Sequence, residues 1–303
     1  MINTVFFGTH QFSIFTLQIL KQNPQINLIA VVTTPDKKIG RKQILTANPV
    51  KKWAIENNIK IIEFANILDV IEKEKLELGI ISYFGYLIPK NVIDQFEKGI
   101  LNIHPSLLPD YAGASPLEWA ILNGEVETGV TLIKINEKFD KGEILDQETI
   151  KLDYSKTKND IYQELFLKGS ELLNKNLNDY LKEHLKLTTQ PIGTFKKAPK
   201  LEKTAGYIDL LKENNETLSK KIMALNPWPT TYTTLQNIAD YYKLTPTKQP
   251  NLKVQIVKVE ESLKTIATEH TLTPQVEIRL TKLKPEGKNE MSFREFKNGY
   301  LKD

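Results

Sequence analysis

The chain has 303 residues, of which 40% are hydrophobic and 26% charged, a composition typical of a soluble globular protein with room for two domains. No run approaches 18 apolar residues and no basic segment opens the chain, so we expect neither a transmembrane helix nor a signal peptide, and a cytoplasmic location. Without cysteine the chain has no disulfides, thiolate zinc sites or cysteine nucleophiles, and its four scattered histidines predict no metal site.

The net charge of +4 is unevenly distributed along the chain. Residues 1–181 hold 20 Lys and Arg against 23 Asp and Glu, a balance of −3, whereas residues 182–303 hold 21 against 14, a balance of +7. A basic second part indicates contact with a polyanion, although the same lysines would also serve a solvated surface.

Strand-like apolar runs alternate with helical patterns through the first half of the chain, which favours an α/β fold with a mostly parallel sheet. The expected strands are 4–7, 26–32, 60–62, 78–82 and 100–104. The expected helices are 12–20, one opening at Asn48-Pro49, 67–76 and 116–122. Strands 130–135 and 143–150 should then form an edge hairpin, before a long amphipathic helix over 158–183.

Residues 184–206 lose this periodicity and are rich in lysine, so we interpret them as a basic linker. A short helix over 217–225 and alternating runs at 230–235, 252–259 and 275–283 follow, a pattern typical of a small β-barrel. The predicted organisation is a first domain over 1–187, a linker over 188–205 and a second domain over 206–303.

The strand 100–104 carries the first candidate site. Because side chains alternate along a strand, Asn102 and His104 share a face, and Pro105 ends the strand just after them. Ligands of open α/β sheets bind at the carboxyl ends of the strands. Asp140, in a glycine-bounded turn, could return to orient the imidazole. Taken alone, Asn-x-His also fits a histidine with a structural hydrogen bond.

Asn102-x-His104, the following Ser106-Leu-Leu-Pro109 and Asp140-x-Gly142 together resemble the formyltransferases that use 10-formyltetrahydrofolate. Further segments are similar to motifs of the methionyl-tRNA formyltransferase family: Phe7-Gly-Thr9, Thr34-Pro-Asp36, Ser82–Pro89, Asn226-Pro-Trp-Pro229 and Leu283–Ser292. The resemblance implies a Rossmann-like, mostly parallel sheet followed by a small OB-like β-barrel domain that helps to hold tRNA.

The same resemblance implies an enzyme that moves a formyl group from 10-formyltetrahydrofolate to the α-amine of methionyl initiator tRNA, with Asn102, His104 and Asp140 as catalytic residues. We expect a monomer without a metal cofactor and without membrane contact. The expected folate-binding residues are Tyr83, Phe84, Gly85, Tyr86, Leu87, Ile88, Pro89, Ser106, Leu107, Leu108 and Pro109. The expected tRNA-binding residues are Lys37, Lys38, Arg41, Lys42, Lys196, Lys197 and Lys200.

Some positions depart from the family pattern. Asp110 and Ala112 stand where basic residues are usual, and His10-Gln11 replaces a proline followed by an acidic residue. The first departure keeps open a formyltransferase that acts on an amino-sugar nucleotide. A second alternative is an RNA-binding protein whose catalytic domain has decayed, although the complete Asn, His and Asp set argues against it.

Overall fold

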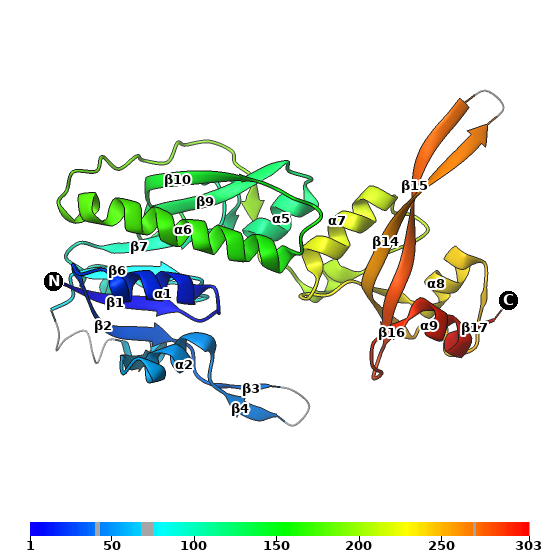
Figure 1. The fold of residues 1–303 in the computed structure, drawn as a ribbon, viewed down its shortest axis with the longest axis horizontal. Coiled ribbons are helices and arrows are strands. Elements are labelled where there is room, and N and C mark those ends of the chain that lie inside the picture. Colours follow the sequence, from blue (N-terminus) through cyan, green and yellow to red (C-terminus); the bar gives the residue numbers. More distant parts are fainter. Residues whose placement is uncertain (40–42, 68–74, 269–270, 303) are drawn as a thin grey trace. The chain divides into compact units, whose positions relative to one another are not determined.

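The computed structural model describes residues 1–39, 43–67, 75–268 and 271–302. The chain divides into two compact units, which are described separately below (Figure 1). The first unit comprises Met1–Leu117 and Val126–Pro199, and the second comprises Glu118–Glu125 and Lys200–Asp303.

A seven-stranded sheet organises the first unit, in the order β10-β9-β7-β6-β1-β2-β5. Five of its strands run parallel to their neighbours, and β9 pairs antiparallel with both β7 and β10. The strands are β1 (Ile2–Gly8), β2 (Ile26–Thr33), β5 (Lys60–Glu63), β6 (Leu78–Ser82), β7 (Ile100–His104), β9 (Glu127–Lys134) and β10 (Glu143–Lys151). The predicted mostly parallel α/β sheet and its edge hairpin are confirmed.

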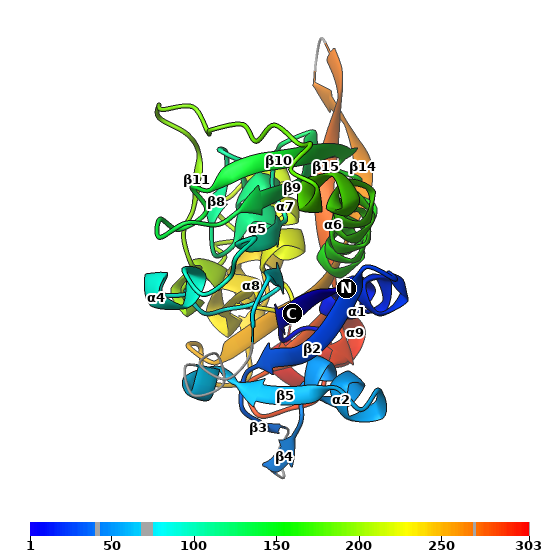
Figure 2. The ribbon, with the colours of Figure 1, turned by 90° about the vertical axis from the view of Figure 1, so that its left-hand side faces the viewer.

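Helices cover the central strands on both faces, which explains why these strands are almost continuously apolar (Figure 2). Figure 1 shows α1 (Ser13–Gln22) and α6 (Lys158–Leu181) side by side on one face. Phe7 and Ile100 belong to a core cluster on the sheet that includes Val92 and Phe96 around α4 (Lys90–Ile93). Two further α-helices of the described residues before 127 are α2 (Pro49–Glu56) and α5 (Pro116–Leu122). In α5 the residues from Glu118 on belong to the second unit.

Three local features differ from the sequence expectations or lie beyond them. Two short paired strands that were not predicted follow β2: β3 (Lys37–Ile39), which carries Lys37 and Lys38, and β4 (Ile44–Thr46). The predicted helix 67–76 lies largely outside the described residues. Residues 188–199, predicted as linker, are fixed to the first unit by backbone hydrogen bonds, including the parallel pair β8 (Ala112–Gly113) and β11 (Lys197–Ala198).

The second unit is rich in strands, as predicted, and these strands pair antiparallel. Its four-stranded sheet has the order β12-β14-β15-β16, and β13 pairs with β17. The strands are β12 (Tyr232–Thr234), β13 (Thr245–Pro246), β14 (Lys253–Thr268), β15 (Thr271–Pro285), β16 (Met291–Ser292) and β17 (Leu301–Lys302). The α-helices after residue 200 are α7 (Asn215–Leu225), α8 (Leu235–Tyr242) and α9 (Phe293–Tyr300), of which α7 was predicted.

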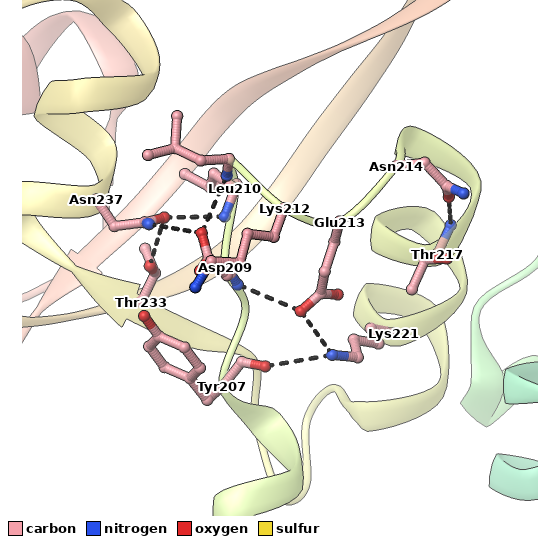
Figure 3. Close-up of polar contacts among 11 residues, drawn as sticks. Tyr207, Asp209, Leu210, Lys212, Glu213, Asn214, Thr217, Lys221, Thr233 and Asn237 are labelled. Atoms are coloured by element: carbon pink, nitrogen blue, oxygen red, sulfur yellow. Dashed lines mark hydrogen bonds and ion pairs between the residues drawn. The ribbon is translucent and has the colours of Figure 1, made fainter.

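A polar network fixes the segment that enters the second unit against two of its helices (Figure 3). The Asn237 amide, at the start of α8, accepts from Leu210 N at 2.9 Å and donates to Asp209 Oδ1 at 2.9 Å. Glu213 accepts from Asp209 N and from Lys221 of α7. The hydrogen bond from Asn237 is the largest of the contacts that lower the pKa of Asp209, against the opposing effect of burial.

Candidate active site

Strand β7 presents two polar side chains on one face at its carboxyl end, as the period of two predicts. Asn102 pairs in register with Ile81 of β6 and His104 with Thr131 of β9. Their neighbours Leu101 and Ile103 are buried in the core. Asn102 and His104 both line a cavity at this strand end, and only 5% of the His104 surface is exposed. The sheet therefore places an amide and an imidazole side by side.

Asp140 reaches the same cavity from the turn between β9 and β10. Its Oδ1 lies 3.6 Å from His104 Nδ1, and its Oδ2 accepts a hydrogen bond of 3.0 Å from Gly113 N. Only 9% of Asp140 is exposed, and its backbone has a φ of +51°. The turn thus brings the carboxylate to the imidazole, and the three residues predicted as catalytic line one cavity.

The other ring nitrogen of His104 faces a backbone carbonyl. His104 Nε2 lies 3.3 Å from Tyr111 O. The Ser106 hydroxyl donates to Asp110 O at 2.8 Å and so closes the turn that places this carbonyl. Both nitrogens of the ring therefore face oxygen atoms that can accept a hydrogen bond, and these contacts fix the orientation of the imidazole from two sides.

The cavity has a volume of about 250 Å³ and a wall rich in aromatic and apolar side chains. Its lining residues are Ile81, Tyr83–Ile88, Asn102–Pro105, Gly113, Ala114, Pro116, Ile135, Asn136, Lys138–Asp140, Tyr162 and Phe166. On one side Tyr86 stacks on Phe64, and Phe84 meets Phe64 edge to face. On the other side Tyr83 packs against Tyr162 and Phe166 of α6. Such a wall suits the faces of a flat ring system, and a small number of polar groups is left for its edge.

The structure places the predicted folate-binding residues in two groups. Residues 83–88 line the cavity, whereas Pro89 and the segment 106–109 are not part of its wall. Pro89 is the N-cap of α4. Leu108 is buried and held by Thr131, whose hydroxyl accepts from Leu108 N at 3.0 Å. Ser106, Leu107, Leu108 and Pro109 thus lie against β9 and outside the cavity wall, and their part in folate binding stays a prediction.

Several lining residues were not predicted from the sequence. Tyr162 and Phe166 come from α6, where their spacing of four places them on one helix face, a pattern that equally fits an ordinary core. Phe139 precedes Asp140 and is exposed. Gly113 ends β8 and Ala114 follows it, in a stretch of the sequence without a regular pattern.

His10, one of the departures noted above, lies next to this aromatic wall. Its ring stacks on Tyr83 with the centroids 4.4 Å apart and lies against Phe12. Burial among these rings lowers the pKa of His10. Near neutral pH the side chain at position 10 therefore behaves as an uncharged aromatic group that supports Tyr83.

The lysines predicted to contact phosphate occupy exposed positions where the structure describes them. Lys37 and Lys38 lie on β3, whereas Arg41 and Lys42 lie outside the described residues. Lys196, Lys197 and Lys200 are exposed, with Lys196 Nζ 5.7 Å from the centre of the Tyr111 ring. Among the described residues no three His, Asp or Glu side chains gather as a metal site would require, and no helix is long and apolar enough to cross a membrane.

Two family models match the chain. The formyl transferase model matches residues 2–177, and the model of the formyl transferase C-terminal domain matches residues 200–301. The chain belongs to the formyl transferase family. It is an enzyme of formyl transfer, in agreement with the resemblance carried by Asn102, His104 and Asp140.

Curated relatives and solved structures extend this result. The methionyl-tRNA formyltransferase of Bacillus cereus (strain G9842) is 31% identical over 99% of this chain and 96% of the relative, and that of Bacillus thuringiensis subsp. konkukian (strain 97-27) is 32% identical with the same coverage. WlaRD, a sugar 3N-formyl transferase, superposes with a TM-score of 0.62 at 22% identity over 95% of this chain and 99% of its own. HypX from Aquifex aeolicus, in complex with tetrahydrofolic acid, gives 0.61 at 18% identity over 100% of this chain and 48% of its own. The structural likenesses show the shared fold.

Proposed function

We propose that this enzyme transfers a formyl group from 10-formyltetrahydrofolate to the α-amine of methionyl initiator tRNA. The observation that carries the transfer chemistry is the convergence of Asn102, His104 and Asp140 on one cavity at the end of β7. The choice of acceptor is supported by the near full-length similarity to methionyl-tRNA formyltransferases, which includes the second unit.

The proposed reaction develops negative charge on the formyl oxygen when the amine attacks the formyl carbon. The Asn102 amide, at the cavity wall, can donate to that oxygen, and a single donor of this kind is worth roughly 3–4 kcal/mol in the transition state. A new C–N bond then replaces the old one, while the amine loses a proton and N10 of the folate gains one. These proton movements need a group that can hold or pass a proton beside the carbon.

His104 is the group that we assign to this task. Its Nδ1 faces Asp140 Oδ1 and its Nε2 faces Tyr111 O, so the doubly protonated ring has an acceptor for each N–H group. In the proposed reaction the neutral ring takes up the amine proton, and its positive charge then stands next to the forming oxyanion. Asp140 balances that charge and fixes the plane of the ring.

The cavity fits a folate donor in both its lining and its position. Phe84, Tyr86 and Leu87 offer aromatic and apolar surface to a pterin ring, and the backbone of residues 83–88 offers the polar groups that its edge requires. The proposed catalytic side chains form the polar end of the same space. In agreement, the solved structure of WlaRD was obtained in the presence of 5-N-formyl-THF, and HypX was solved with tetrahydrofolic acid.

The exposed lysines support a nucleic-acid acceptor. Four exposed lysines can meet phosphate groups. Lys37 and Lys38 lie on β3, Lys197 lies on β11, and Lys196 directly precedes it. We propose that the strand-rich second domain, from about residue 206, helps to hold the tRNA, because it matches the C-terminal domain model of the family.

An amino-sugar nucleotide is the second candidate acceptor. The presence of Asp110 where basic residues are usual favours it, as do the sugar N-formyltransferases among the structural neighbours. However, Asp110 Oδ1 accepts a hydrogen bond of 2.9 Å from Lys196 N. A local structural task therefore accounts for this carboxylate, and the substitution loses weight as evidence against tRNA.

Incubation with a radiolabelled 10-formyl donor and either charged initiator tRNA or a dTDP-amino sugar tests the proposal. We expect label on the tRNA, and turnover reduced about 100-fold or more in Asn102→Ala, His104→Ala and Asp140→Ala. Gln25→Ala is the control, because it changes an exposed amide that donates to Asn178 and does not line the cavity. Label on the amino sugar alone would show that the acceptor is the amino-sugar nucleotide and not the tRNA. Near-normal turnover in one of the three variants would remove that residue from the mechanism.

A further inference from the structure

The Asp140 turn is closed on its exposed side by its own residues. Asn136 Nδ2 donates to Lys141 O at 3.1 Å, and Lys138 N donates to Asn136 Oδ1 at 2.9 Å. These bonds leave the carbonyl groups of Asp140 and Gly142 to be paired from another part of the chain. The backbone of Asp140 also has a positive φ, an uncommon conformation for a residue with a side chain, and contacts with its surroundings stabilise it.

Gln190 supplies the missing donors from the segment 188–199. Its Nε2 donates to Asp140 O at 2.8 Å and to Gly142 O at 2.8 Å. The amide therefore connects two backbone carbonyl groups of the turn, one of them that of Asp140 itself. Only 8% of Gln190 is exposed. Its orientation follows from its partners, because the opposite orientation would direct the amide oxygen at two carbonyl oxygens.

Gln190 Oε1 is buried and receives no hydrogen bond from the residues that the structure describes. What this side chain provides is the pair of N–H groups on the two carbonyls of the turn.

The segment around Gln190 is fixed at both ends, which makes the glutamine a rigid support. On one side, Thr188 exchanges two backbone hydrogen bonds with Ile144 of β10, at 2.8 and 2.9 Å. On the other side, Lys196 O accepts from Tyr111 N at 2.7 Å, and Ala198 pairs with Gly113. The same segment therefore touches the turn of Asp140 and the turn that faces His104 Nε2.

We propose that Gln190 is a positioning residue for the formyl-transfer reaction: it fixes the backbone of Asp140 so that the carboxylate stays on His104. The inference rests on the proposed catalytic role of Asp140. It assigns a task to a segment that the sequence indicates only as a linker. Gln190 itself does not line the cavity and acts through Asp140.

The decisive experiment compares Gln190→Met, which keeps the shape and removes both donors, in the wild-type and Asp140→Asn backgrounds. We expect kcat to fall roughly 10- to 100-fold in the wild-type background, with the KM of the formyl donor nearly unchanged, because a misplacement of about 1 Å has effects of this size. In the Asp140→Asn background the same change should lower kcat less than about 2-fold. Equal losses in both backgrounds would overturn the proposal.

Asn176→Leu is the matched control. Asn176 is an equally buried amide of the same unit, 7% exposed, whose Nδ2 also donates twice, to Asp146 Oδ2 and Leu172 O at 2.9 Å each. It should lower stability without the dependence on Asp140. Hydrogen exchange gives a readout that needs no turnover: the amides of 138–142 should exchange faster in Gln190→Met and not in Asn176→Leu. Faster exchange without any loss of kcat would count against the catalytic role of Asp140, whereas unchanged exchange would overturn the support by Gln190.

Discussion

Replacing Gly113 by alanine tests how tightly the turn around the candidate site is built. Gly113 has a φ of +141°, and a Cβ atom there would lie 2.1 Å from Ala198 O and 2.6 Å from Ala198 C. Both obstacles are backbone atoms of β11, which is paired with β8, so no side chain can rotate away. Moving from 2.1 Å to the ordinary contact distance of 3.4 Å requires a shift of 1.3 Å.

That shift has a cost that the structure allows us to estimate. Gly113 N donates to Asp140 Oδ2 at 3.0 Å, and a hydrogen bond to a charged group contributes about 1.5–3 kcal/mol. The backbone conformation adds about 1–3 kcal/mol once the residue carries a Cβ atom. We therefore expect Gly113→Ala to lower the free energy of unfolding of the first unit by about 3 kcal/mol or more, equivalent to a fall in Tm of about 6–12 °C.

Thermal unfolding followed by circular dichroism, together with kcat for formyl transfer, measures both consequences. The expected loss of kcat is about 10-fold or more, because the Asp140 carboxylate loses its hydrogen bond from Gly113 N. Gly299→Ala is the control for stability, since a Cβ atom there meets nothing within 4 Å and its φ is not positive. A Gly113→Ala variant with the stability and turnover of the Gly299→Ala variant would refute the reasoning.

Two further predictions concern protonation and charge. Since burial lowers the pKa of His10 in the folded chain, the unfolded chain takes up this proton at a higher pH, and stability should decrease on acidification below pH 6.5. The fall in Tm between pH 7 and 5 should accordingly be smaller in His10→Gln than in the wild type, and equal slopes would contradict this sign. Changing Lys37, Lys38 or Lys197 to glutamine should reduce the slope of log affinity for charged tRNA against log salt by about 1 each, and an unchanged slope would remove that lysine from the interface.

The regular parts of the fold could be predicted because regular patterns encode them. The strand 100–104 was predicted with its observed bounds, since apolar residues and Pro105 mark it, and the period of two placed Asn102 and His104 together. The long helix α6 shows its apolar stripe and begins at a capping box formed by Thr157 and Asp160. In both elements the information lies within the segment itself.

The short helices of the second unit show a different limit. Thr234 caps α8, and Ser292 forms a capping box with Glu295 at the start of α9. These signals are present in the sequence, but α8 and α9 have only eight residues each and follow directly after strands. A strand was expected over 230–235, but the observed strand β12 ends at Thr234. Thr234 is the N-cap of α8, and this cap, not the apolar pattern, determines where the strand gives way to the helix.

Irregular segments escaped prediction because backbone groups make their contacts. Residues 188–199 have no periodic side chains, and an interpretation as a linker was the natural one. Their backbone nevertheless pairs with Ile144, Tyr111 and Gly113. Similarly, closeness to His104 in the sequence suggested that the segment 106–109 faces the cavity, but the turn after Pro105 directs it to Thr131.

Backbone strain explains why the candidate site depends on such distant segments. Tyr83, Tyr111 and Asp140 all have a positive φ, and each contributes to the cavity or to the contacts of His104. Tyrosine has no intrinsic preference for this conformation, so nothing local in the sequence predicts it. Conformations of this kind persist only where surrounding contacts fix them. For Asp140 and Tyr111 those contacts come from the segment 188–199, so the geometry offered to a formyl group is determined jointly by β7 and by a stretch of chain more than 80 residues away.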